Sequence, residues 1–252
     1  MNPLKENLER LEAAIAEACR RAGRPRAEVE LMAVSKTYPV QTIREAAELG
    51  LSLFGESRVQ EFSAKSAELE SRGAEALGVS LRCALRVHLI GHLQTNKALR
   101  AVELFDAVDS LGSLRLAERL NEVAARCGKR VPVLIEVKLS AEESKAGLNP
   151  DSEEAAQLLE RLPDLQHLQV QGLMTIAPFD VPEEQTRACF RSLRQWRDRW
   201  AAQYPRLRFD VLSMGMSGDF ELAIEDGATR IRVGTSLFGQ RPALTSAAQV
   251  QA

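Results

Sequence analysis

The sequence has few histidines, few aromatic residues, little net charge and no long apolar run. Its 252 residues include three histidines, and aromatic side chains make up 5% of them. A net charge of −2 gives no reason to expect nucleic acid or an anionic membrane as a partner. No apolar stretch approaches the roughly 18 residues of a membrane helix, and residues 1–7 lack an apolar signal core. We therefore expect a cytoplasmic protein that does not contact a membrane.

Cysteine and histidine spacing argues against a metal centre. The four cysteines lie tens of residues apart, without the short paired spacing of zinc sites or redox pairs, so we expect reduced thiols. His88 and His92 stand four residues apart, which is the spacing of a helical metal pair. The Leu-Ile-Gly between them favours a strand end and a turn, and no third ligand is apparent. The sequence therefore predicts no metal site.

Short apolar runs alternate with segments of helical spacing along the chain. Eight runs predict strands, at residues 30–36, 51–55, 85–90, 104–109, 131–139, 168–174, 207–213 and 229–234. Helical spacing occurs at residues 4–22, 40–49, 114–125, 152–162, 183–202 and 219–225. Eight strand-then-helix units that close on themselves predict an α/β fold, a single (β/α)8 TIM barrel with an extra N-terminal helix. We expect residues 1–252 to form one domain, with a frayed tail at 241–252.

Polar and small residues follow the strands whose ends would form the mouth of this barrel. Lys36 closes the first strand, and glycine-bearing turns at Ser213–Gly218 and Arg232–Ser236 follow the last two. Loops after strands seven and eight often bind phosphate in this fold, and a lysine amine forms an imine with an aldehyde. The combination predicts a phosphorylated aldehyde as ligand. Taken alone, Lys36 also fits a lysine that extends into solvent, and each glycine fits an ordinary turn.

If the ligand carries a pyridine ring, Arg232 predicts the charge that lies beside the ring nitrogen. A permanent cation beside a pyridine nitrogen disfavours protonation of that nitrogen and weakens the ring as an electron sink. The sequence is equally consistent with Arg232 in a surface ion pair.

Seven ordered motifs together resemble a known family. They are Ala33-Val-Ser-Lys36, Phe54-Gly-Glu56, His88–Lys97, Ser144-Lys-Ala-Gly147, Gly172–Pro178, Ser213–Asp219 and Gly227–Gly239. From about residue 5 to 240 the chain resembles the YggS/PROSC pyridoxal phosphate homeostasis proteins. The resemblance implies a barrel like the N-terminal domain of bacterial alanine racemase, carrying pyridoxal 5′-phosphate (PLP) as a Schiff base.

The resemblance also implies roles for individual residues. By position, Lys36 matches the imine lysine and Arg232 the arginine beside the pyridine nitrogen. The phosphate would be held by Ser213, Gly234 and Thr235, with backbone help from Met214 and Gly215. His88, Asn96 and Lys97 match a motif whose role the residues do not explain. Ser57 stands where the family usually has asparagine, and Val87 where an aromatic residue usually precedes the histidine. We count Ser57 and His88 among the cofactor-binding residues and expect binding to survive with altered affinity.

The function implied is that of a PLP-binding protein in vitamin B6 homeostasis and amino-acid balance, without robust catalytic turnover. We expect a monomer, with apo forms of PLP-dependent enzymes as recipients. Two other classes stay open. A PLP-dependent racemase or decarboxylase shares cofactor and barrel, but racemases use a tyrosine on a second domain, and the only tyrosines here are Tyr38 and Tyr204. A cofactor-free Schiff-base aldolase would show no pyridoxal spectrum.

Overall fold

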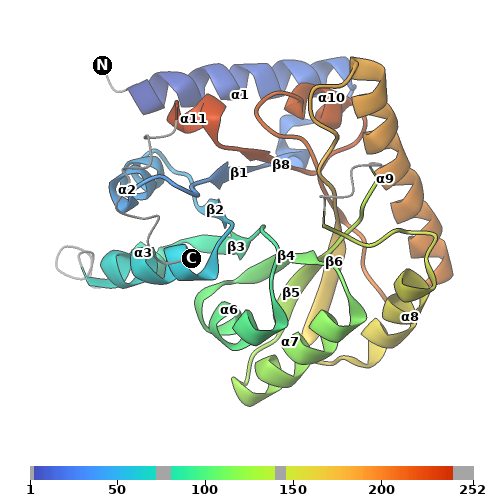
Figure 1. Cartoon of the computed structure of the whole chain (residues 1–252). Coiled ribbons are helices and arrows are strands. Elements are labelled where there is room, and N and C mark those ends of the chain that lie inside the picture. Colours follow the sequence, from blue (N-terminus) through green and yellow to red (C-terminus); the bar gives the residue numbers. More distant parts are fainter. Residues whose placement is uncertain (1–2, 72–80, 140–145, 241–252) are drawn as a thin grey trace.

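The computed structural model describes residues 3–71, 81–139 and 146–240, in which eight parallel strands close into a barrel in chain order (Figure 1). The strands are β1 Glu30–Val34, β2 Leu53–Glu56, β3 Arg86–Leu89, β4 Ala107–Leu111, β5 Val131–Glu136, β6 Leu168–Met174, β7 Val211–Ser213 and β8 Arg230–Val233. This confirms the predicted TIM barrel. The predicted tail at 241–252 lies outside the described residues.

Helices surround the barrel and follow the strands along the chain (Figure 1). They are α1 Pro3–Arg21, α2 Val40–Glu48, α3 Val59–Ser71, α5 Leu81–Ala84, α6 Ala98–Leu104, α7 Leu114–Arg126, α8 Glu153–Arg161, α9 Glu183–Gln203, α10 Phe220–Glu225 and α11 Thr235–Phe238, with short 3-10 turns η1 Arg26–Glu28, η2 Thr95–Lys97 and η3 Leu162–Asp164. The extra N-terminal helix is confirmed as α1. Over the described ranges, none of these helices has the length and apolar character needed to cross a bilayer.

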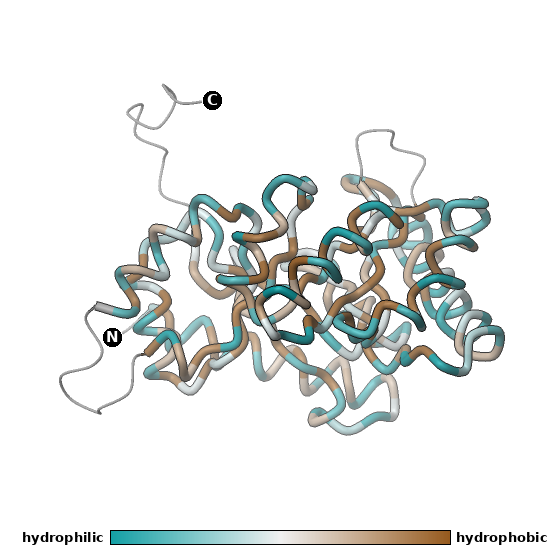
Figure 2. Tube along the Cα trace, turned by 90° about the horizontal axis from the view of Figure 1, so that it is seen from below, coloured by the Kyte–Doolittle hydropathy of each residue, from teal (hydrophilic) through white to brown (hydrophobic). Residues whose placement is uncertain are grey.

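The strands separate an apolar outer layer from a partly polar lumen. Alternate residues of β8, such as Ile231 and Val233, join the core beneath the helices. Arg232, between them, pairs in register with Met32 of β1. A Cβ at Gly55 would lie 2.8 Å from the sulfur of Met32, so the lumen is closely filled at this level. Figure 2 shows the apolar segments running through the middle of the molecule and hydrophilic segments on the outer turns.

Several strands differ from their predicted bounds, and at β4 and β7 the reason is that a neighbouring helix takes part of the apolar run. The prediction placed a strand at residues 104–109, but Leu104 ends α6 and the amide of Phe105 donates to the carbonyl of Ala101 at 2.9 Å, which closes the last helical turn. β4 therefore begins at Ala107. Similarly, most of the run 207–213 precedes β7, because Phe209 packs on Trp200 of α9 instead of joining the sheet.

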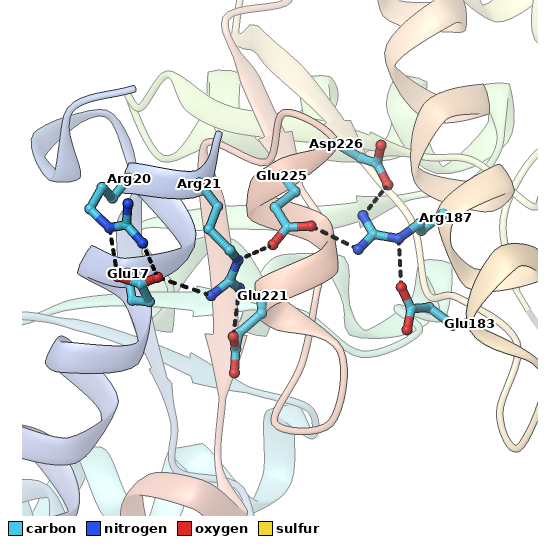
Figure 3. Close-up of polar contacts among 8 residues, drawn as sticks. All are labelled: Glu17, Arg20, Arg21, Glu183, Arg187, Glu221, Glu225 and Asp226. Carbon is cyan, nitrogen blue, oxygen red and sulfur yellow. Dashed lines mark hydrogen bonds and ion pairs between the residues drawn. The ribbon is translucent and has the colours of Figure 1, made fainter. Parts of the chain in front are cut away.

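Helix α1 braces the two short helices that follow the last strands. Arg21 of α1 bonds to Glu225 of α10 at 2.6 Å, and Glu225 also bonds to Arg187 of α9 at 2.7 Å (Figure 3). The side-chain amide of Asn7 donates to the carbonyl of Leu237 in α11 at 2.9 Å. These contacts hold the outer sides of α10 and α11, the helices that follow the loops after β7 and β8.

Candidate functional site

Lys36 lies in a tight turn directly after β1, at the C-terminal end of the barrel. The amide of Ser35 donates to the carbonyl of Gly55 at 3.0 Å, and the amide of Tyr38 donates back to the carbonyl of Ser35 at 3.1 Å. Thr37 has a φ of 68°, a left-handed conformation that is rare for a β-branched residue. Lys36 itself is half-buried. The predicted imine lysine therefore sits at the barrel mouth in a constrained backbone.

The loops after β7 and β8 lie against each other beside this turn. The amide of Arg232 donates to the carbonyl of Gly215 at 3.0 Å, and the amide of Ser236 donates to the hydroxyl of Ser217 at 3.3 Å. A Cβ at Gly234 would lie 3.2 Å from the carbonyl oxygen of Val34, the last residue of β1. The structure thus brings both glycine-bearing loops to the strand end that carries Lys36.

Glycine is required at Gly215 for two reasons. Its φ is 88°, and an added Cβ would fall 2.6 Å from the Cβ of Ala223 in α10. The carbonyl of Arg230 accepts a hydrogen bond from the amide of Met214 at 3.1 Å, so this stretch follows the barrel wall before it turns into α10. The close approach between loop and helix depends on the missing side chain.

Arg232 of β8 reaches along the lumen wall to the C-terminal ends of the two preceding strands, β7 and β6. Its side chain donates to the hydroxyl of Ser213 and to the carbonyl of Thr175, each at 2.8 Å. Ser213 is fully buried and Arg232 is 4% exposed. Burial lowers the pKa of Arg232, while Asp109, Asp219 and Glu136 act in the opposite direction. A surface ion pair is therefore the wrong interpretation of Arg232, which is a buried cation facing the mouth.

Glu136 is an acidic group of the lumen that sequence reasoning missed. It ends β5 and is 5% exposed. Burial raises the pKa of Glu136 to about 7, against a smaller lowering by the charge of Arg232. An isolated carboxylate at the end of an apolar strand was the only sequence signal for it. Arg232 and Glu136 therefore bring a buried cation and a carboxyl group that titrates near neutrality to the mouth.

His88 belongs to a second buried network deeper in the barrel. Its Nδ1 lies 3.0 Å from Oδ1 of Asp109, and Oδ2 of that carboxylate accepts from Arg230 at 3.2 Å. Arg230 in turn bonds to Glu30 at 2.7 Å. Burial works to raise the pKa of Asp109, but His88 and Arg230 lower it overall. The carboxylate favours the tautomer of His88 with a proton on Nδ1, which leaves Nε2 as a hydrogen-bond acceptor.

Ser57, Asn96 and Lys97 are the remaining predicted residues. Ser57 follows β2, where a Cβ at Gly91 would lie 2.3 Å from its carbonyl oxygen, so Gly91 permits the two loops to touch. Asn96 and Lys97 belong to η2, and Asn96 lines a surface hollow with Glu118 of α7. The motif at 88–97 is thus divided between the lumen and the outer surface. Within the motif Ser144–Gly147, residues 144 and 145 lie outside the described residues.

A hollow of about 580 Å³ opens at the opposite end of the barrel, before the starts of β6 and β7. Its lining includes Arg130, His167 and Arg208. It is remote from Lys36, and ligand sites of this fold lie at the C-terminal end of the strands. We therefore place the candidate site at the mouth, where the chemistry-bearing side chains converge.

Known proteins resemble the chain over nearly its whole length. A sequence profile of the alanine racemase N-terminal domain matches residues 7–242. The pyridoxal phosphate homeostasis protein of Aquifex aeolicus is 40% identical over 236 residues, which are 94% of this chain and 97% of that protein. The protein of the same name from Escherichia coli K12 is 37% identical over 96% of this chain and 98% of its own length.

Solved structures agree with this assignment. PipY of Synechococcus elongatus with PLP bound is 43% identical, has a TM-score of 0.76, and matches 89% of this chain and 100% of its own. An alanine racemase of Clostridium difficile is 16% identical with a TM-score of 0.71 over 96% of this chain and 58% of its own, a likeness of fold alone. The chain belongs to the family of pyridoxal phosphate homeostasis proteins, whose barrel is the alanine racemase N-terminal domain.

Proposed function

We propose that this protein binds PLP at the barrel mouth, with a Schiff base on Lys36, and serves vitamin B6 homeostasis. The observation that carries the proposal is the convergence of the Lys36 turn with the loops after β7 and β8, since Gly234 packs on the last residue of β1. PipY, which binds PLP, is 43% identical over 89% of this chain. PLP supplies an aldehyde that condenses reversibly with a primary amine.

The residues present suit a phosphorylated aldehyde. Hydroxyls of Ser213 and Thr235 and backbone amides at Gly215 and Gly234 are neutral donors of the kind that bind phosphate in this fold, whereas the amide of Met214 already donates to the carbonyl of Arg230. An added Cβ at Gly215 would clash with α10, and one at Gly234 would press against the backbone at the end of β1. Ser57 and His88 remain proposed contacts at the edge and floor of the site.

Arg232 favours a holding role over catalysis. Its guanidinium is fixed by Ser213 and Thr175, so a permanent positive charge stays in the lumen. Such a charge disfavours a proton on a neighbouring pyridine nitrogen, and the ring then stabilises a carbanion less well. We therefore propose a PLP carrier without robust turnover, which acts in the cytoplasm as a single-domain monomer and supplies apo PLP-dependent enzymes.

The racemase alternative lacks, among the described residues, a tyrosine placed as the second base that racemases use. The phenol of Tyr38 donates to the carbonyl of Gly239 at 2.6 Å, and its ring is 4% exposed. Tyr204 caps the C-terminal end of α9, outside the barrel. Neither phenol faces the mouth from the side opposite Lys36. Absence of D-alanine formation from L-alanine, measured on protein loaded with PLP, is the expected result.

The experiment is an absorbance titration with PLP of the wild type, Lys36→Ala and Lys138→Ala. Lys138 follows β5 at the same end of the barrel and is a matched control. The wild type and Lys138→Ala should develop an imine band that borohydride removes, and Lys36→Ala should not. An unchanged band in Lys36→Ala would refute the proposal, and no band in any protein would support a cofactor-free aldolase.

A further inference from the structure

The turn that carries Lys36 is held in a conformation that it would not adopt alone. Thr37 has a φ of 68°, a conformation that is unfavourable for a β-branched residue and persists only where the surroundings enforce it. Such outliers gather at functional sites. The contacts that enforce this turn therefore bear on what Lys36 does.

Those contacts come from one buried lysine on a neighbouring helix. The amine of Lys65 in α3 donates to the carbonyl of Ser35 at 2.9 Å, to Oε1 of Glu56 at 2.8 Å and lies 2.7 Å from Oε1 of Glu61. The same Glu61 oxygen accepts the amide of Thr37 at 2.6 Å. The residues on both sides of Lys36 are thus bound to one group, which we call the Lys65 anchor (Ser35, Glu56, Glu61, Lys65 and the Thr37 amide).

A contribution to folding stability does not explain the Lys65 anchor well. The Lys65 side chain is 9% exposed and that of Glu56 is fully buried, and desolvation of such a pair offsets much of its attraction. Glu56 Oε1 also accepts the hydroxyl of Ser35 at 2.8 Å, yet its Oε2 is buried and has no hydrogen-bond partner among the described residues. A better packed apolar cluster would stabilise the fold at least as well. What the charges provide is a fixed geometry of the turn.

We propose that Lys65, with Glu56 and Glu61, is a positioning residue that holds the Lys36 turn so that its amine faces the phosphate loops. The inference rests on the proposed function and adds to it a residue that touches neither the aldehyde nor the phosphate. Loss of the Lys65 anchor should slow and weaken imine formation while leaving the phosphate loops intact, because these follow β7 and β8 on the other side of Lys36.

The first test compares Lys65→Met with Lys5→Met, which removes an exposed lysine of α1. Imine formation with PLP is followed by stopped-flow absorbance. The equilibrium constant for the imine should be about tenfold lower in Lys65→Met, a difference of about 1.4 kcal/mol. Binding of pyridoxine 5′-phosphate, which has no aldehyde, should stay within about twofold of wild type by calorimetry. Equal imine formation in a folded Lys65→Met would overturn the inference, whereas no imine in the wild type would overturn the proposed function.

A second set of variants covers the case in which Lys65→Met does not fold, since it leaves Glu56 buried without its cation. Glu61 is partly exposed, so Glu61→Ala and Glu61→Gln should both fold. Only glutamine retains an acceptor for the Thr37 amide, and imine formation should fall more in Glu61→Ala. The neutral pair Glu56→Gln with Lys65→Met should regain thermal stability but not imine formation. If the double variant recovered imine formation together with thermal stability, the role of Lys65 would be purely structural. Equal imine formation in the two Glu61 variants would indicate the same.

Discussion

Glu136→Gln should change the pH dependence of stability more than any exposed carboxylate does. The folded protein raises the pKa of Glu136 from its ordinary 4.5 to about 7, chiefly because the carboxyl group is buried. Below the lower pKa the side chain is protonated in both the folded and unfolded states, so it contributes nothing to the pH dependence of stability. Between the two values the unfolded chain loses its proton while the folded protein retains it, and stability therefore falls as pH rises.

The magnitude follows from the gap between the two pKa values. A difference of about 2.5, at about 1.4 kcal/mol for each pKa unit, gives a loss of about 3 kcal/mol above neutral pH. Glutamine carries no charge at any pH, so Glu136→Gln escapes this loss. The free energy of unfolding of the variant minus that of the wild type should therefore increase by about 3 kcal/mol from about pH 4.5 to about pH 8.

Urea unfolding followed by circular dichroism across this pH range measures the difference directly. Subtraction of the wild-type curve removes the contributions of the other titrating groups, and Glu48→Gln, at the exposed end of α2, serves as the control. A difference that stays constant with pH would show that folding does not raise the pKa of Glu136. The description of Glu136 as a carboxyl group whose pKa is raised by burial would then be wrong.

Two further predictions concern the phosphate loops and the barrel wall. Ser213→Ala and Thr235→Val should each weaken PLP retention by about 0.5–3 kcal/mol in equilibrium dialysis, through lost hydrogen bonds to a charged group, and Ser213→Ala also deprives Arg232 of an acceptor. Unchanged retention in both would place the phosphate elsewhere. Gly172→Ala should lower the free energy of unfolding by at least about 3 kcal/mol, because its Cβ would lie 1.9 Å from the carbonyl oxygen of Val211. Gly218→Ala, with no atom near the added carbon, should unfold like the wild type, and equal values for both glycines would contradict this account.

The barrel and its mouth were predictable because their signals are local in sequence. Each strand is a short apolar run, and a residue that directly follows a parallel strand must lie at the same end of the barrel. This placed Lys36, Ser213 and Gly234 together although they are far apart in the chain. Strand ends were predicted less well, as at Leu104, because a helix and a strand that pack on one core use the same apolar residues.

The buried charges were not predictable from sequence, because their partners lie on distant strands. His88 and Arg230 are 142 residues apart and share the carboxylate of Asp109. Lys65 lies in a segment for which the sequence analysis predicted neither a helix nor a strand, and only the fold shows that its amine meets the carbonyl of Ser35. Arg232 had two equally good interpretations until its bonds to Ser213 and Thr175 were seen. Closure of the barrel, which no local pattern encodes, decides all of these contacts.

The central claim is that Lys36 holds the cofactor, and peptide mapping of the borohydride-reduced protein tests it most directly. Wild-type protein should be saturated with PLP, reduced, digested and analysed by mass spectrometry. The account predicts one pyridoxyl-modified peptide, with the modification on Lys36 and an occupancy that falls when inorganic phosphate competes for the loops. Modification of Lys65 or Lys138 in place of Lys36 would contradict it.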